Sequence, residues 1–355
     1  MLKVLQINKF LYPHQGGIES VSESIIEALE DTNLELFNIC FSNNKDFPSR
    51  KNVKRFFSRF TFFSQPISLS YMLFIFRNLK KFDACIVHFP NVLALIALIF
   101  SKSNKIFIYW HSDIHQQNIV LRKLFYTFEK ILIRRSYKII FATDAHRTGS
   151  VHSFKNEKSL SIPYTLNNEE AAGKTFTRRI QKRSNKENII FIGRLVEYKG
   201  VAFLIKALKN MSFKLSIIGS GPLEEKLRQI SKNQSNIKFL GRVEDLESIF
   251  ETASMLILPS INKAEMFGIV QIEAFARGIP VISTLIEGSG VPLINANSLT
   301  GYLAKPGSDQ SLRECLKKFD SNKDTFDSNA IRNYYLENFS NNAFKQNLIE
   351  ALYSD

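Results

Sequence analysis

The chain of 355 residues alternates between short β-rich runs and helix-like segments, and the alternation occurs twice. In the first half the runs predict strands at 4–8, 34–41, 84–88, 105–111 and 138–143. In the second half they predict strands at 188–193, 214–219, 237–240, 255–259 and 280–283. Helix-like segments separate the strands, for example at 20–30, 121–135, 202–209 and 223–231. This pattern favours parallel sheets with helices on both faces. We therefore expect two doubly wound, Rossmann-like α/β domains that face each other across a cleft.

The boundary between the two halves is expected near residue 170. Residues 167–188 are rich in Asn, Lys, Arg and Glu and contain one glycine, which predicts a linker. We therefore place an N-terminal domain at 1–170 and a C-terminal domain at 171–337.

Composition narrows the class of protein. A hydrophobic content of 45% excludes global disorder. The three cysteines show no pairing pattern, which favours a reduced cytoplasmic setting. Residues 1–8 predict a first strand rather than a signal peptide, and the longest apolar run, 92–100, is shorter than the roughly 20 residues that cross a bilayer. We expect a cytoplasmic protein that is soluble or peripheral to the membrane.

The net charge of +14 is concentrated in the first half, where residues 1–166 hold 22 Lys and Arg against 12 Asp and Glu. No acidic residue lies between Asp46 and Asp83, and Phe and Tyr are interleaved with the basic residues of this segment: Arg50, Lys51, Lys54, Arg55, Arg59, Arg77, Lys80 and Lys81. Such a surface suits the anionic inner face of the plasma membrane, at roughly 1 kcal/mol per basic residue. A solvated basic face over a Phe-rich core is the alternative. Nucleic acid is not expected, because the sequence has no zinc-finger, RNP-like or helix-turn-helix pattern.

Glu265 and Glu273 bracket a glycine turn and an apolar run. If a helix starts near Gly268, its first turn offers unpaired backbone N–H groups to an anion. Glu273, about a turn and a half further on, can accept two hydrogen bonds from a vicinal diol such as a ribose. The arrangement suits a nucleoside diphosphate sugar, and the alternative is a buried amphipathic helix with two incidental glutamates.

Two glycine-containing turns follow predicted strands. Gly16 and Gly17 lie between the first strand and a helix, where backbone can approach a negatively charged ligand. In the second half, the segment 191–200 carries Arg194, which can grip a diphosphate bidentately, and Lys199, which adds a point charge.

An ordered series of motifs runs through the second half: Gly193-Arg194-Leu195, Lys199-Gly200, Gly219-Ser220-Gly221-Pro222, Phe239-Leu240-Gly241, Pro259-Ser260, then the Glu265–Glu273 segment. This series resembles the retaining nucleotide-sugar glycosyltransferases of family 4, which have the GT-B fold. The Gly16-Gly17 turn matches the N-terminal loop of that family. The resemblance covers nearly the whole chain and points to bacterial polysaccharide, O-antigen or lipopolysaccharide biosynthesis.

The resemblance implies a role for each matched residue. Residues implied in catalysis are Arg194, Lys199, Glu265 and His111. Residues implied in donor binding are Gly16, Gly17, Gly193, Gly219, Arg242, Val243, Phe267, Gly268, Ile269 and Glu273. It also implies that the first domain binds the acceptor, that the second binds the nucleotide sugar, and that a C-terminal helix at 338–355 crosses back onto the first domain. The other histidines, among them His88, His146 and His152, are interpreted as ordinary core or surface residues.

The reaction implied is transfer of a sugar from a UDP- or GDP-sugar to a lipid-linked oligosaccharide or glycan acceptor. No Asp-x-Asp motif occurs, so we expect no metal ion and no other cofactor, with Arg194 and Lys199 stabilising the leaving diphosphate. Two alternatives remain: a nucleotide-sugar epimerase or hydrolase of the same fold, and a non-catalytic nucleotide-sugar-binding module. The donor sugar, nucleobase and acceptor are left open.

Overall fold

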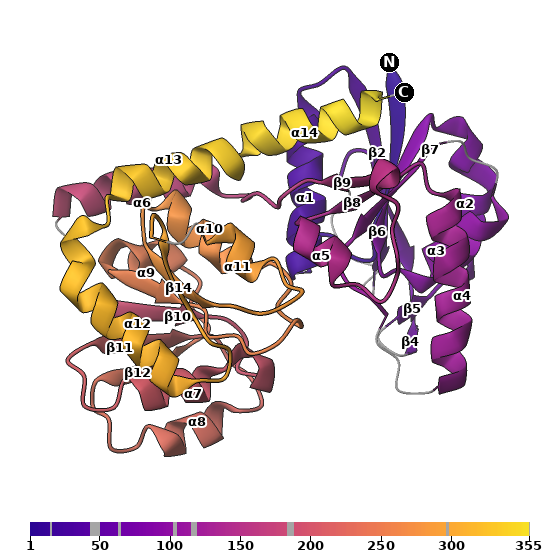
Figure 1. Ribbon diagram of the computed structural model, residues 1–355. Coiled ribbons are helices and arrows are strands. Elements are labelled where there is room, and N and C mark those ends of the chain that lie inside the picture. The colour runs from indigo at the N-terminus through magenta and orange to yellow at the C-terminus, as the bar shows by residue number, and fades with distance from the viewer. Residues whose placement is uncertain are drawn as a thin grey trace. The chain divides into compact units, whose positions relative to one another are not determined.

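The computed structural model describes residues 1–14, 16–42, 50–62, 65–101, 105–114, 119–182, 188–295 and 298–354. The chain divides into two compact units. The first consists of residues 1–167 and 344–355, and the second consists of residues 168–343. Each unit contains a parallel sheet with helices on both faces, as Figure 1 shows. The expected pair of doubly wound α/β domains is confirmed.

The strands of the first unit are β1 (Leu2–Ile7), β2 (Leu34–Ser42), β3 (Val53–Phe57), β4 (Phe60–Phe62), β5 (Gln65–Ile67), β6 (Ala84–Phe89), β7 (Lys105–Trp110), β8 (Lys138–Phe141) and β9 (Ser159–Ser161). Its helices are α1 (Gly17–Glu30), α2 (Leu69–Asn78), α3 (Val92–Phe100), α4 (Ile119–Arg135) and α5 (Asp144–Thr148), joined by most of α14 (Asn341–Tyr353).

The strands of the second unit are β10 (Asn188–Ile192), β11 (Lys214–Ile218), β12 (Ile237–Gly241), β13 (Met255–Ile257), β14 (Val281–Thr284) and β15 (Gly301–Ala304). Its helices are α6 (Glu169–Lys182), α7 (Val201–Ala207), α8 (Glu224–Ile230), α9 (Leu246–Thr252), α10 (Ile269–Ala276), α11 (Val291–Ile294), α12 (Asp309–Asn322) and α13 (Ser328–Asn338).

The first sheet has the order β3-β2-β1-β6-β7-β8-β9, and every neighbouring pair is parallel. β1 and β6 lie side by side although two further strands of this sheet separate them in sequence. From β1 the chain proceeds to one edge of the sheet, and from β6 to the other. The central strands are buried on both faces, since all six residues of β6 are buried.

The second sheet has the order β12-β11-β10-β13-β14-β15 and is also parallel throughout. β10 and β13 are its central neighbours, and the chain again leaves them in opposite directions. Such a topological switch point opens a crevice beyond the carboxyl ends of the two strands, where doubly wound sheets bind their ligands.

The segment expected as a linker contains a helix, so that prediction was wrong. α6 spans Glu169–Lys182 and packs on the second unit, where Arg179 is 6% exposed. Arg179 donates hydrogen bonds to the carbonyl oxygens of Arg277, at 2.6 Å, and Ala253, at 2.9 Å. The segment is polar in composition, and its helix is stabilised by tertiary contacts that the sequence pattern does not show.

Candidate functional site

The loops that follow β10 and β13 bring two predicted site residues together. Lys199 belongs to the 3-10 turn η3 (Glu197–Lys199) after β10, and Glu265 lies in the loop after β13. The Lys199 Nζ atom is 2.5 Å from the Glu265 Oε2 atom, and their side chains are only 13% and 11% exposed. Ser260 donates its hydroxyl to the same Oε2 atom at 2.9 Å. A fixed ion pair therefore occupies the switch point of the second sheet.

Arg194 lies in the same loop as Lys199 but in a different environment. Its side chain is exposed, and it makes no side-chain hydrogen bond or ion pair with the described part of the chain. Its positive charge is therefore available to a ligand, whereas that of Lys199 is shared with Glu265.

Gly219 allows the loops after β10 and β11 to approach closely. Its φ angle is +125°, and a Cβ atom there would lie 2.0 Å from the carbonyl oxygen of Gly193. Arg242, after β12, is exposed and donates from Nε to the Ser220 hydroxyl at 3.1 Å, and Val243 beside it is half-buried. Four of the predicted residues thus lie at the carboxyl ends of the neighbouring strands β10, β11 and β12: Gly193, Gly219, Arg242 and Val243.

The helix expected to start near Gly268 is confirmed. α10 begins at Ile269, and Gly268 precedes it with a φ angle of +73°, a left-handed conformation that favours glycine. Phe267, just before, is buried. The backbone N–H groups of the first turn lack intrahelical partners, as at any helix start. α10 therefore places an anion-favouring helix terminus directly after the Glu265 loop.

Glu273 lies in the second turn of α10. Burial raises the pKa of Glu273, while the positive charges of Arg277 and Lys199 act in the opposite direction. The charge of Lys199 therefore acts on Glu273 as well as pairing with Glu265.

Arg277, which the sequence analysis did not single out, anchors the end of α10. It is 1% exposed, donates to the carbonyl oxygen of Glu273 at 2.6 Å and forms an ion pair with Glu247 of α9. Burial alone would raise the pKa of Glu247, but hydrogen bonds from Arg277 and Thr175 and the charge of Arg277 lower it overall. These contacts fix α10, and with it Glu273, against α9.

The first unit also carries predicted residues at the carboxyl edge of its sheet. Gly16 precedes α1 and Gly17 begins it, as expected from the glycine turn after β1. Gly16 itself has extended backbone, with a φ angle of −179°. These residues place the start of a 14-residue helix next to the switch point between β1 and β6.

His111 directly follows β7, as predicted, and is 6% exposed. Its Nε2 atom is 2.9 Å from His88 Nδ1, and its Nδ1 atom is 2.7 Å from the Tyr164 hydroxyl. Both ring nitrogens are therefore engaged inside the unit, which does not favour proton transfer by His111. The interpretation of His88 as an ordinary core residue missed this contact, because nothing local in the sequence pairs two histidines 23 residues apart.

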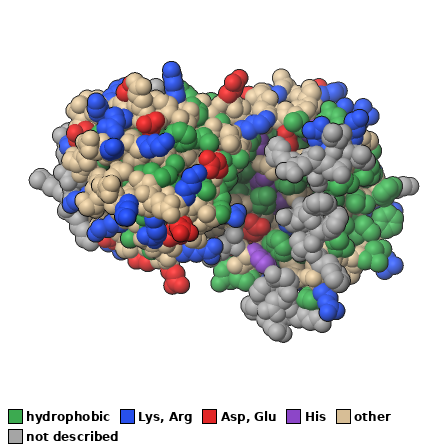
Figure 2. All heavy atoms as spheres, turned by 90° about the horizontal axis from the view of Figure 1, so that it is seen from below, with side chains coloured by type: hydrophobic (Ala, Val, Ile, Leu, Met, Phe, Trp, Pro, Cys, Tyr) green, Lys and Arg blue, Asp and Glu red, His purple; other side chains and the backbone are tan. Residues whose placement is uncertain are grey.

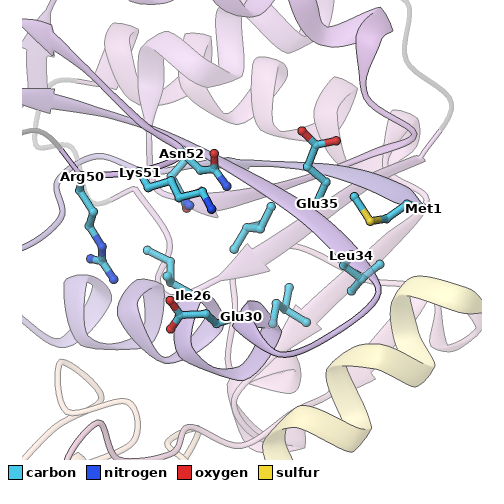
Figure 3. A pocket seen from close by; sticks show the side chains of 11 residues that line it. Met1, Ile26, Glu30, Leu34, Glu35, Arg50, Lys51 and Asn52 are labelled. Atoms are coloured by element: carbon cyan, nitrogen blue, oxygen red, sulfur yellow. The ribbon is translucent and has the colours of Figure 1, made fainter.

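The cavity in Figure 3 lies away from these residues. It has a volume of about 440 Å³ and is lined by the amino ends of β1 and β2, the end of α1 and the chain before β3. Its lining carries both signs of charge, with Glu30 and Glu35 as well as Arg50 and Lys51. Ligands of doubly wound sheets bind at the opposite, carboxyl ends of the strands.

Comparison with known proteins places the chain in a family. The family Glycosyl transferases group 1 matches residues 174–345, which include every predicted site residue of the second unit. Residues 174–345 of the chain belong to the group 1 glycosyltransferases. It is therefore an enzyme, as expected, and the family resemblance seen in the sequence is confirmed.

Relatives of this group 1 glycosyltransferase extend over most of its length. It is 26% identical over 330 residues to the D-rhamnosyltransferase WbpZ of Pseudomonas aeruginosa, covering 89% of this chain and 86% of the relative. It is 25% identical over 338 residues to the O-antigen chain mannosyltransferase C of Escherichia coli, covering 91% and 90%.

Solved structures share the fold of the whole enzyme. Anabaena Alr3699/HepE in complex with UDP has a TM-score of 0.79 at 17% identity and covers 99% of both chains. The apo form of the lipopolysaccharide outer core galactosyltransferase WaaB has a TM-score of 0.75 at 17% identity, also with 99% of both chains covered. The expected GT-B fold is confirmed.

Buried histidines make the stability of the enzyme dependent on pH. Burial lowers the pKa of His88 to about 3 and that of His146 to about 4, and burial together with the imidazoles of His88 and His146 lowers that of His111. The unfolded chain takes up these protons near pH 6.5, whereas the native state does not. The free energy of unfolding should therefore keep its highest value above pH 7. Below pH 6.5 it should decrease by about 1.4 kcal/mol for each histidine and each pH unit. The decrease should end where the histidines of the folded protein take up protons, near pH 4 and below.

Urea unfolding of the first unit between pH 7.5 and pH 5 measures this loss, which for three histidines amounts to about 4 kcal/mol at pH 5.5. In the variant His88→Asn, the free energy of unfolding should change with pH about one third less steeply. Equal urea midpoints at pH 7.5 and pH 5.5 would contradict the prediction.

Proposed function

We propose that this enzyme transfers a sugar, with retention of anomeric configuration, from a UDP- or GDP-sugar to a lipid-linked oligosaccharide or glycan in polysaccharide or O-antigen biosynthesis. The observation that carries the proposal is the cluster at the switch point of the second sheet. It combines the Lys199–Glu265 ion pair, the Arg194 side chain, which is unpaired among the described residues, and the start of α10. The relatives named for D-rhamnose and mannose transfer, and the UDP bound to HepE, support the substrate class.

The chemistry of the cluster suits departure of a diphosphate. Breaking the anomeric C–O bond leaves negative charge on the diphosphate, and fixed cations and backbone N–H groups aimed at that charge lower the barrier. Arg194 and Lys199 supply the cations, and Gly268 and Ile269 supply N–H groups, with those of Gly16 and Gly17 proposed to assist. Glu273 is proposed to hold the ribose hydroxyls.

Glu265 is better suited to holding the donor sugar than to attacking it. A double displacement needs a carboxylate free to bond the anomeric carbon. The Oε2 atom of Glu265 already accepts from Lys199 and Ser260, and this fixes the carboxylate in one orientation. We therefore propose attack by the acceptor on the face from which the diphosphate departs, with the leaving phosphate oxygen taking the proton of the acceptor.

The donor and the reaction can be tested together. A panel of UDP- and GDP-sugars is screened for thermal stabilisation, since a donor at 100 times its Kd adds about 2.7 kcal/mol. The stabilising donor is then incubated with lipid-linked acceptors, with and without EDTA. We expect transfer that EDTA leaves intact, because Arg194 and Lys199 are proposed to supply the positive charge that a metal ion would otherwise bring to the diphosphate.

The other outcomes of this test separate the alternatives. Free sugar or an epimerised donor without acceptor would indicate a hydrolase or epimerase. Donor binding without any turnover would indicate a binding module. Loss of transfer in EDTA that Mg²⁺ restores would contradict the metal-independent reaction.

The acceptor proposal places the enzyme on the anionic inner face of the plasma membrane. Among the described helices, none combines the length and apolar character that crossing a bilayer requires. Leu69 and Phe76 are 65% and 53% exposed and lie two turns apart on one face of α2, next to the exposed Arg77, Lys80 and Lys81. Figure 2 shows green hydrophobic side chains gathered on one edge of the surface, with blue Lys and Arg side chains around them.

Liposome sedimentation tests membrane contact. The variant Arg77→Glu/Lys80→Glu/Lys81→Glu should bind anionic vesicles at least about 100-fold more weakly, since each basic residue contributes roughly 1 kcal/mol. Leu285→Ser/Leu293→Ser, which changes exposed apolar residues of the second unit, is the matched control and should bind normally. Sedimentation of the wild type that does not depend on anionic lipid would count against the proposal.

A further inference from the structure

Four side chains form a continuous chain of hydrogen bonds at the carboxyl ends of β1, β6 and β7. Gln6 Nε2 lies 2.9 Å from His88 Nε2, His88 Nδ1 lies 2.9 Å from His111 Nε2, and His111 Nδ1 lies 2.7 Å from the Tyr164 hydroxyl. All four residues are buried, with exposed fractions of 0%, 1%, 6% and 7%. The chain of bonds runs from the middle of the first sheet to the segment after β9.

Gln6, the first residue of this hydrogen-bonded series, determines which atom donates and which accepts in every bond. Gln6 Nε2 also lies 3.1 Å from the carbonyl oxygen of Ser22, which can only accept, so the NH₂ group of Gln6 must face both neighbours. His88 Nε2 must then accept, which places the proton of His88 on Nδ1. That proton is donated to His111 Nε2, which places the proton of His111 on Nδ1 as well. The opposite direction would set two N–H donors against each other at Gln6.

The rings of His88, Tyr109 and His111 are nearly parallel. The ring planes of His88 and His111 differ by 5° with centroids 5.1 Å apart, and those of Tyr109 and His111 differ by 2° at 4.9 Å. Burial keeps both imidazoles neutral, because it lowers the pKa of His88 to about 3 and also lowers the pKa of His111, to which His88 and His146 contribute further. No described acidic side chain bonds to either ring.

We propose that Gln6 and His88 are positioning residues that hold His111 in the tautomer protonated on Nδ1 and in one ring orientation at the carboxyl edge of the first sheet. The inference rests on the proposed function and on the catalytic role that the family resemblance implies for His111. A ring that could change tautomer or rotate would no longer present a constant surface to the reacting sugar. A displacement of about 1 Å in a positioned group can lower a rate by about 100-fold.

Nuclear magnetic resonance of protein labelled with ¹⁵N-histidine tests the chain of bonds without any substrate. We expect His88 and His111 each to carry a proton on Nδ1 and none on Nε2, and both to remain neutral at pH 6. In Gln6→Met, which removes the donor to His88, the signals should report a mixture of tautomers. Protonation of wild-type His111 on Nε2, or a charged ring at pH 6, would overturn the proposal.

Kinetics test the consequence for the reaction. His88→Phe keeps a ring but removes both nitrogens, and it should lower kcat by about 10- to 100-fold while KM for the donor changes less than about threefold. His88→Asn keeps a donor near the Nδ1 position and should recover most of that loss. His152→Phe, which changes another buried histidine of the same unit, should keep its kcat below its melting temperature. Equal kcat values for His88→Phe and the wild type would overturn the positioning role.

The two experiments separate this inference from the proposed function. If the wild type transfers no sugar with any donor, the proposed function and the positioning role both fail, and the tautomer measurement still decides whether the chain of hydrogen bonds exists. If the wild type is active and its His111 is protonated on Nε2, the proposed function stands and this inference fails.

Discussion

Replacing Arg194 by alanine is expected to lower kcat by about 100- to 1,000-fold, the usual result of removing one group that stabilises developing negative charge. Arg194 is exposed at the switch point of the second sheet and makes no side-chain hydrogen bond or ion pair within the described residues. Its guanidinium can therefore offer a full positive charge and all its N–H donors to a diphosphate. The stabilisation increases as the diphosphate leaves and gains negative charge.

Steady-state kinetics with the best donor of the panel measure this effect. Arg194→Lys keeps the charge but not the bidentate geometry, and it should recover only part of the loss. Arg228→Ala is the matched control, because Arg228 is an exposed arginine of the same unit paired with Glu224 on α8. Glu265→Ala should also lose transfer, and near wild-type transfer by both Arg194→Ala and Glu265→Ala would refute the assignment.

Replacing Arg277 by methionine is expected to lower the free energy of unfolding of the second unit by about 3 to 5 kcal/mol, the usual cost of removing one partner from a buried ion pair. Arg277 is almost fully buried, its Nε atom donates to Glu247 Oε2 at 3.0 Å, and its guanidinium lies 4.2 Å from the centroid of the Phe250 ring. Methionine keeps part of the packing but leaves the Glu247 carboxylate without its cation.

Hydrogen exchange of the most protected amides of β13 and β14 measures the unfolding free energy of this unit. The double variant Arg277→Met/Glu247→Leu should be more stable than Arg277→Met, because it removes the uncompensated charge as well. Arg228→Met, at an exposed ion pair, should change the free energy by less than about 1 kcal/mol. Equal exchange rates for Arg277→Met and the wild type would show that the ion pair does not hold α10.

Much of the fold could be predicted from the sequence because its signals are local. Buried runs such as 84–88 and 255–259 mark central strands, and Gly268 marks a helix start, where its φ angle of +73° favours glycine. The short edge strands β3, β9 and β15 were not predicted, since three to five residues give a weak pattern. The sequence predicted a linker in place of α6, because the segment is rich in charged residues and its buried face includes a charged residue, Arg179, beside Ala172.

The sequence by itself determined which residue types follow which strands: Arg194 and Lys199 after β10, Glu265 after β13 and His111 after β7. Only the tertiary structure decided which of them meet. Lys199 pairs with Glu265 because β10 and β13 are neighbours, and His111 joins Gln6, 105 positions before it, because β1, β6 and β7 are adjacent. Strand order follows from how whole helices and strands bury their apolar faces against one another, and no short stretch of sequence contains that information.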